Sequence, residues 1–238
     1  MIMSEGKQRS YTIDVPANYD MATPHKLVYA SHWVSSNDET VVGEGYYHLK
    51  PKFQAANEKV IFIAPQALPG NPNGTWATMD DVDNVLFDDL LAFAKSNLCI
   101  DTTRVFAVGH SYGAMQTYSL STDHQKDIRA AVGIAPANWN IYEPPPTGQP
   151  IAWMSTTGMG DTLTPWDREG AGAGAGRRIG GAAARSGHHR AHGHERRALV
   201  VLRRLRRPLG RHAPAGGGPG RRHCAGDPRV QHRRLRGA

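Results

Sequence analysis

The chain has 238 residues, and its 28 Lys and Arg against 21 Asp and Glu give a formal net charge of +7. That length suits one domain with a substantial apolar core and excludes a mini-protein that needs disulfides to fold. No run of about 18 apolar residues occurs, so no transmembrane helix is expected. A basic balance first suggests a nucleic-acid or membrane-surface partner, so the location of the charge matters.

The charge is divided unevenly along the chain. Residues 1–166 carry 10 Lys and Arg against 17 acidic residues, a net charge of −7. Residues 167–238 carry 18 Arg, no Lys and 4 acidic residues, a net charge of +14, and all 18 aromatic residues lie before them. We therefore expect a folded domain over 1–166 and an Arg-, Gly- and Ala-rich tail over 167–238.

The tail has no aromatic residues and is about one quarter Arg. It cannot bury enough apolar surface to offset its ordering entropy, so disorder is expected. It allows three interpretations: a nucleic-acid-binding arm, a His-rich metal tract, or translation of a shifted reading frame through a GC-rich region. Natural basic arms usually mix Lys with Arg, and the His cluster has no Cys or carboxylate around it. The composition therefore favours the shifted frame. The His cluster consists of His188, His189, His192 and His194.

In the first 166 residues, strands and helices are expected to alternate. Residues 11–15 alternate in polarity, which predicts an antiparallel edge strand. Continuous apolar runs predict buried strands over 27–30, 60–64, 105–108, 130–134 and 151–154.

Two helices are predicted between these strands. In the first, one apolar face contains Leu86, Leu90, Ala94 and Leu98, and Asp80 or Asp81 can cap it. The second covers 111–120, and the Pro-rich segment 143–149 is expected to be an exposed loop. Strands alternating with helices predict an α/β fold, a mostly parallel sheet with helices on both faces.

One five-residue motif carries the chemistry. Gly109-His110-Ser111-Tyr112-Gly113 follows a predicted strand and begins a predicted helix, which is the setting of a G-x-S-x-G nucleophile elbow. Ser111 is then the candidate nucleophile. The backbone N–H of Tyr112 is expected to point toward a developing oxyanion.

A serine nucleophile needs a base and an acid, which follow it in chain order in this kind of site. Asp161 comes after the strand at 151–154 and is the candidate acid, although a loop Asp can also simply cap a turn. Every later His lies in the tail. His110 cannot serve because neighbouring side chains diverge, and the earlier histidines are expected at the surface, so the triad is expected to lack its His. Those earlier residues are His25, His48 and His124.

The second oxyanion donor is expected in the loop 31–35, from a backbone N–H near Val34. Trp33 in this loop is expected to pack at the edge of a substrate cleft. Trp76 follows a polar stretch and either lines the same cleft or covers the core.

Taken as an ordered set, six segments over residues 7–166 resemble fungal feruloyl esterases of carbohydrate esterase family 1, with polyhydroxybutyrate depolymerase-like esterases as near relatives. The resemblance implies an α/β-hydrolase fold, secretion, no metal or cofactor, and hydrolysis of feruloyl esters on plant cell-wall xylan. It assigns Ser111 as nucleophile and Asp161 as acid. The segments are residues 9–13, 31–33, 63–66, 74–76, 97–101 and 109–113.

The chain departs from that pattern at both ends. The family's His stands in an Asp-Gly-Gly-His-like context, which residues 167–238 lack, so we expect weak or no activity and a missing last strand and helix. Residues 1–7 have no apolar signal-peptide region. Three alternatives remain: an acetylxylan esterase, a polyhydroxybutyrate depolymerase-like esterase, and a nucleic-acid or polyanion binder acting through the Arg-rich tail. Acyl preference and oligomeric state do not follow from the pattern.

Overall fold

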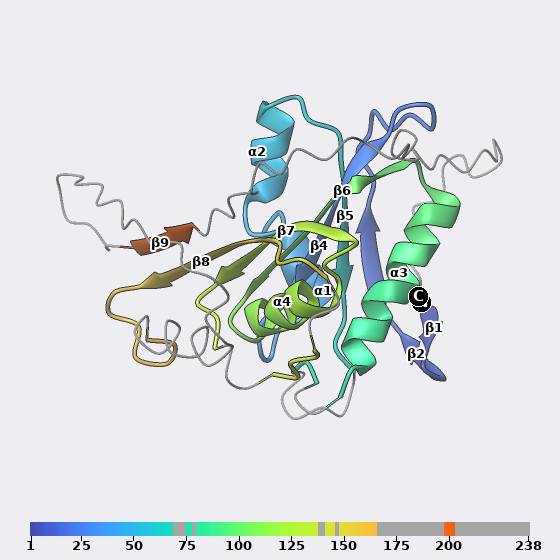
Figure 1. Ribbon diagram of the computed structural model, residues 1–238. Coiled ribbons are helices and arrows are strands. Elements are labelled where there is room, and N and C mark those ends of the chain that lie inside the picture. The colour runs from blue at the N-terminus through green and yellow to red at the C-terminus, as the bar shows by residue number, and fades with distance from the viewer. Residues whose placement is uncertain (69–74, 78–79, 138–140, 146–147, 166–197, 203–238) are drawn as a thin grey trace, which may run out of the picture.

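A seven-stranded sheet is the centre of the fold (Figure 1). The computed structural model describes residues 1–68, 75–77, 80–137, 141–145, 148–165 and 198–202. The strand order is β3-β5-β4-β6-β7-β8-β9, and a small hairpin, β1-β2, stands apart from it. In chain order the strands are β1 Ile2–Ser4, β2 Lys7–Arg9, β3 Tyr11–Asp14, β4 His25–Ser31, β5 Val60–Pro65, β6 Ile100–His110, β7 Ile128–Ile134, β8 Ala152–Gly158 and β9 Ala198–Leu202.

The central strands are parallel, as the continuous apolar runs predict. β4 pairs with β5 and β6, β6 with β7, and β7 with β8, all in parallel register. β3 pairs antiparallel with β5 at one edge, which confirms the alternating pattern of that segment. Because parallel strands end at the same edge of a sheet, the loops after β4, β6 and β8 gather there.

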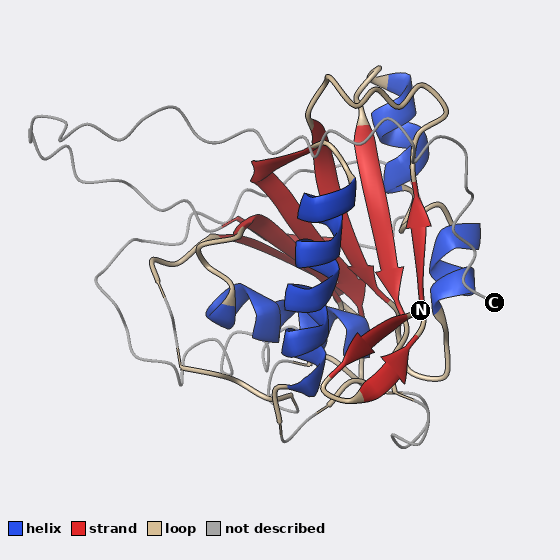
Figure 2. Cartoon of the chain, turned by 90° about the vertical axis from the view of Figure 1, so that its right-hand side faces the viewer, coloured by secondary structure: helices blue, strands red, loops and turns tan. Residues whose placement is uncertain are grey.

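Helices cover both faces of the sheet (Figure 2). Two short helices, α1 Asp38–Gly43 and α2 Leu49–Ala55, pack on one face, and two longer ones, α3 Val82–Asn97 and α4 Tyr112–Asp123, pack on the other. Among the described residues no helix is long and apolar enough to cross a bilayer.

Strand β4 shows why the sheet is buried on both faces. Leu27 and Tyr29 point into the core beneath α3, whereas Val28 and Ala30 point into the core beneath α1 and α2. All four residues are at most 2% exposed. An uninterrupted apolar run is what a strand covered on both sides requires.

Two helices differ from the prediction. Helices α1 and α2 were not predicted because both are short; Asn37 caps α1 by accepting a hydrogen bond from the Thr40 N–H at 2.8 Å. Asp81 stands at the N-cap of α3 but makes no side-chain capping bond. Of the two caps that the sequence predicts for α3, the structure favours Asp80, whose carboxylate accepts from the Val82 N–H at 3.4 Å.

The tail also differs in part from its prediction as disordered. Residues 198–202 form strand β9, which pairs antiparallel with β8, so that prediction is wrong for these five residues. Their sequence, Ala-Leu-Val-Val-Leu, is an apolar run rich in β-formers, and the edge of β8 offers unpaired backbone groups. The rest of the tail, including the proposed His-rich tract, lies outside the described residues.

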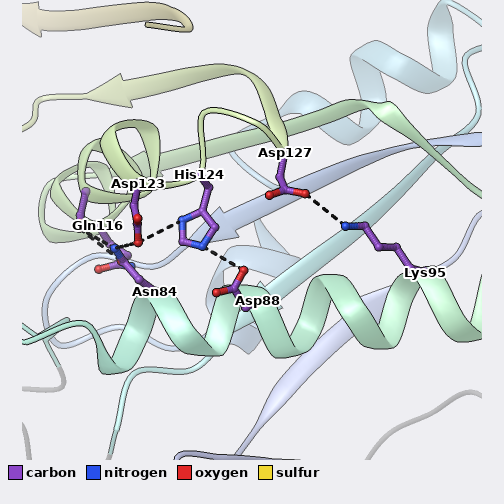
Figure 3. A network of polar contacts seen from close by, with 8 residues as sticks. Asn84, Asp88, Lys95, Gln116, Asp123, His124 and Asp127 are labelled. Carbon is purple, nitrogen blue, oxygen red and sulfur yellow. Dashed lines mark hydrogen bonds and ion pairs between the residues drawn. The ribbon is translucent and has the colours of Figure 1, made fainter. Parts of the chain in front are cut away.

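A polar network joins α3 to α4 (Figure 3). Asn84 donates to Asp123 at 3.3 Å and accepts from Gln116 at 2.9 Å. His124 lies between Asp88 and Asp123, with Nε2 3.1 Å from the Asp88 carboxylate. His124 is only 6% exposed, so its predicted surface position is wrong. The reason is that the His124 ring packs against α3, edge-on to the core residue Phe87.

The surface prediction is also wrong for His25 and holds for His48. His25 is fully buried at the start of β4, where its ring stacks near Tyr19 and its Nδ1 lies 3.2 Å from the Cys99 carbonyl. His48 is exposed at the N-cap of α2.

Candidate active site

Ser111 is the single residue between the end of β6 and the start of α4. Its backbone has φ 53° and ψ −122°, a conformation that costs an L-residue of the order of 1–3 kcal/mol. Serine at an N-cap usually caps its helix, but Ser111 makes no such bond. The strained turn therefore leaves the hydroxyl available for another partner, as a nucleophile elbow requires.

Two glycines make this turn possible. A Cβ built on Gly109 would lie 2.1 Å from the Gly113 carbonyl oxygen. A Cβ on Gly113 would lie 2.1 Å from the Ser31 oxygen and 2.5 Å from the His32 oxygen. The elbow thus packs backbone to backbone against the loop that follows β4, which is the loop predicted to supply the second oxyanion donor.

That loop is held by aromatic side chains. The Tyr47 hydroxyl donates to the Ser31 carbonyl at 2.5 Å. The half-buried Trp33 ring lies between Tyr47 and His110, with ring centroids 6.3 Å and 5.7 Å away. Trp33 therefore sits beside the elbow, where a wall of a substrate site is expected.

Trp76 lies in the core, at 1% exposure. Its Nε1 donates to the His32 carbonyl at 2.7 Å, and its ring centroid lies 4.7 Å from that of His32. This favours the second of its two predicted roles, covering the core. Residues 69–74 and 78–79 on either side of it lie outside the described residues.

Asp161 lies in the loop after β8. Its Oδ1 accepts from the N–H groups of Leu163 and Thr164, and its Oδ2 accepts from the Thr164 hydroxyl at 2.9 Å. These hydrogen bonds, led by that from the Thr164 N–H, hold the pKa of the carboxyl below its usual range. Asp161 is thus an ionised carboxylate that caps its own turn. Oδ2 accepts one of these hydrogen bonds. A carboxylate oxygen can accept two, so Oδ2 can accept one more.

Ser111 and Asp161 belong to the same edge of the sheet. The Ser111 N–H donates to the Ile134 carbonyl at 2.9 Å, and the Ala135 N–H donates to the Thr156 carbonyl at 2.7 Å. The pairing of β6 with β7 and of β7 with β8 therefore continues to this edge of the sheet. The two loops are two strand spacings apart, about 10 Å.

His110 is the described histidine next to the nucleophile. Burial lowers the pKa of its ring, and the negative charges of Glu44 and Asp161 oppose that effect. All histidines after Asp161 lie outside the described residues. No cluster of three or more His, Cys, Asp or Glu side chains suited to a metal occurs in the described part of the chain.

The buried histidines predict a loss of stability in mild acid. Burial lowers the pKa of His25, His32 and His110 from the ordinary 6.5. Below about pH 6.5 the unfolded chain takes up protons that the folded chain does not, so the unfolding free energy falls as pH drops toward the folded pKa values. We expect a loss of about 1–3 kcal/mol between pH 7 and pH 5, measured by urea unfolding.

Single substitutions separate this effect from general acid sensitivity. Replacing the buried His25 with phenylalanine should reduce the change of the unfolding free energy with pH, whereas replacing the exposed His48 with glutamine should not. Equal slopes in the wild-type chain and the His25→Phe variant would contradict the prediction.

A family model described as "Alpha/beta hydrolase family" matches residues 28–237. The chain belongs to the alpha/beta hydrolase family. The fold supports this membership independently, with parallel central strands, helices on both faces and a strained serine between β6 and α4. The α/β-hydrolase fold class expected from the sequence is therefore confirmed.

Among curated relatives, the chain is similar to fungal feruloyl esterases. It is 30% identical over 164 residues to a probable feruloyl esterase C of Aspergillus niger, covering 67% of this chain and 57% of that protein. It is 32% identical over 141 residues to feruloyl esterase D of Neurospora crassa, covering 56% of this chain and 47% of that protein. The resemblance seen in the motifs is confirmed, and the chain spans about half the length of these relatives.

Solved structures agree on the fold. A CE1 ferulic acid esterase from Anaeromyces mucronatus superposes with a TM-score of 0.53 at 17% identity, covering 68% of this chain and 71% of that one. A thermostable esterase gives the same score and identity over 68% of this chain and 45% of that one. At such identities the likeness concerns the fold alone.

Proposed function

We propose that this chain carries the nucleophile of a serine carboxyl-ester hydrolase of the feruloyl esterase type. The observation that carries the proposal is the strained backbone of Ser111, with its hydroxyl not used as a helix cap. A residue holds such a conformation only when its surroundings enforce it, and here Gly109 and Gly113 allow strand and helix to approach closely.

The reaction follows from the groups around Ser111. The Ser111 Oγ attacks the ester carbonyl while a histidine takes its proton, and the N–H groups of Tyr112 and Val34 hold the oxyanion. The C–O bond to the alcohol then breaks, and the alcohol leaves with the proton from that histidine. Water hydrolyses the acyl-enzyme to release the acid. Asp161 orients the imidazole and stabilises its charge.

The histidine of this scheme is assigned to no described residue. His110 stands next to Ser111 but faces Trp33 and the loop after β4. A chain that lacks the base keeps the residual catalysis of its oxyanion hole and binding site. We therefore propose weak activity for these 238 residues.

The substrate class proposed is feruloyl esters on plant cell-wall xylan, hydrolysed outside the cell. The names of the curated relatives support feruloyl esters as the substrate, and the motif resemblance supports xylan and the extracellular location. Acetyl and hydroxybutyryl esters fit the same chemistry, and their relative rates distinguish the alternatives.

Substitution of Ser111 tests the proposal. We expect slow hydrolysis of p-nitrophenyl acetate and methyl ferulate, and its loss to the buffer rate in Ser111→Ala. The matched control is Ser10→Ala, an exposed serine, which should keep the full residual rate. An unchanged rate in Ser111→Ala would contradict the proposal, whereas fast turnover that needs Ser111 would show that a tail histidine supplies the base.

The Arg-rich tail supports one alternative function, because its net charge of +14 can bind any polyanion. Removing residues 167–238 separates the two activities. Salt-sensitive binding to a DNA oligonucleotide should disappear with the tail, while any Ser111-dependent hydrolysis should remain.

A further inference from the structure

His32 is fully buried two residues before Val34, the candidate oxyanion residue of this loop, and both of its ring nitrogens make hydrogen bonds. Nδ1 lies 2.8 Å from the Trp33 carbonyl oxygen, and Nε2 accepts from the Ala67 N–H at 3.1 Å. A carbonyl oxygen can only accept and an N–H can only donate, so these partners determine the tautomer. His32 is neutral, with its proton on Nδ1. Burial, which lowers its pKa, favours the same state.

The Nδ1–H of His32 donates to the peptide group between Trp33 and Val34, whose N–H is the candidate oxyanion donor. The Trp33 carbonyl and the Val34 N–H belong to one planar trans peptide, so they point in opposite directions. The Trp33 carbonyl also accepts from the Ser36 N–H at 3.2 Å, closing a turn in which Ser35 has φ 57°. Within the described residues, the Val34 N–H has no hydrogen-bond partner.

We propose that His32 is a positioning residue for ester hydrolysis, which fixes the Trp33–Val34 peptide so that the Val34 N–H is directed at the oxyanion. This rests on the proposed function. By donating to the Trp33 carbonyl, the ring sets the orientation of the peptide plane and polarises its N–H. The bond from Ala67 anchors the ring to the chain that follows β5.

The surroundings of His32 make the ring a rigid support. Trp76 donates to the His32 carbonyl, and Gly113 lies so close that a Cβ on it would be 2.5 Å from the same carbonyl oxygen. The loop after β4 is thereby tied to β5 and to the elbow itself. Preorganised donors of this kind stabilise a developing charge without reorganising during the reaction.

Two isosteric substitutions separate the two ring nitrogens. In His32→Asn the amide NH₂ takes the place of Nδ1 and can still donate to the Trp33 carbonyl. In His32→Gln the amide oxygen takes the place of Nε2 and can still accept from Ala67. Each variant keeps one buried hydrogen bond and loses the other, so their stabilities should be similar.

The rates should nevertheless differ. We expect the Ser111-dependent hydrolysis of p-nitrophenyl acetate to stay within about threefold of wild type in His32→Asn and to fall at least about tenfold in kcat in His32→Gln, toward the 10²–10³-fold typical of a lost oxyanion donor. KM should change little in either. Equal losses in both variants, tracking their stabilities, would overturn the proposal in favour of simple packing.

An NMR readout keeps the inference independent of activity. In the ¹⁵N-labelled chain the His32 proton should reside on Nδ1, and the Val34 amide resonance should shift in His32→Gln but not in His32→Asn. A proton on Nε2, or equal Val34 shifts in both variants, would overturn the positioning role. If these signals are as expected but no Ser111-dependent hydrolysis exists, the proposed function fails and the control of the Val34 peptide by His32 stands.

Discussion

Replacing Gly113 with alanine is expected to lower the unfolding free energy by at least about 3 kcal/mol and to abolish any Ser111-dependent hydrolysis. The new Cβ would lie 2.1 Å from the Ser31 oxygen and 2.5 Å from the His32 oxygen, and both obstacles are backbone atoms that cannot rotate away. Insertion of a methyl into a close-packed region costs about 1–3 kcal/mol when side chains can yield, and more when they cannot. Relief would require helix α4 to move away from the loop after β4.

Gly109 should behave in the same way, since its Cβ would lie 2.1 Å from the Gly113 oxygen. The matched control is Gly43→Ala in helix α1, where a Cβ meets nothing within 4 Å. Alanine there should be neutral or stabilising by about 0.4–1 kcal/mol. Urea unfolding measures all three. An unfolding free energy for Gly113→Ala within about 1 kcal/mol of wild type would show that the close approach in the elbow is not needed.

These two glycines also show what the sequence predicts well. The spacing of Gly109, Ser111 and Gly113 after an apolar strand is a local signal, because the strained turn at Ser111 and the contact of Gly109 with Gly113 arise within five residues. The buried strands β4 and β5 were predicted for a similar reason, since an uninterrupted apolar run marks a strand covered on both faces. The same prediction is wrong for β8, which is only half-buried along most of its length. Even the turn at Asp161 is local, closed by Leu163 and Thr164.

Buried polar residues were predicted poorly because their partners lie far along the chain. His32 depends on Ala67, 35 residues away, and His25 on Cys99, 74 residues away. In the sequence such a histidine looks like any polar loop residue, which is why the sequence wrongly predicts a surface position for His25 and His124. The one signal available for His32 is its position, two residues before the expected oxyanion donor Val34.

Arg9 and Asp83 form the most deeply buried ion pair among the described residues. Breaking it is expected to lower the unfolding free energy by about as much as the Gly113→Ala substitution. Arg9 lies on β2 and Asp83 on α3, at 1% exposure each, with Nη2 2.5 Å from Oδ1. Arg9 also donates to the Gln66 carbonyl, and Asp83 also accepts from the Ala77 N–H. Nε and Nη1 of Arg9 are buried and have no hydrogen-bond partner in the described part of the chain, so the guanidinium depends heavily on this carboxylate.

Removing one charge leaves the other buried and uncompensated. We therefore expect Asp83→Asn and Arg9→Met each to lower the unfolding free energy by about 3–5 kcal/mol. The double variant should lose clearly less than the sum, because no lone charge remains in the core. The control cycle uses Lys95→Met and Asp127→Asn, whose pair is about one third exposed and should couple by no more than about 1 kcal/mol. Urea unfolding of all six variants measures both cycles, and additive losses for Arg9 and Asp83 would contradict the prediction.

The pair also bears on the candidate active site. The carbonyl that Arg9 holds belongs to Gln66, and the next residue, Ala67, donates to the ring of His32. Loss of Arg9 should therefore loosen the support behind the Trp33–Val34 peptide as well as the core. In Arg9→Met, under conditions where the chain remains folded, the Val34 amide resonance should shift, whereas the Lys95→Met control should leave it unchanged. A Val34 resonance that stays in place in Arg9→Met would show that the ion pair stabilises the core without reaching the oxyanion loop.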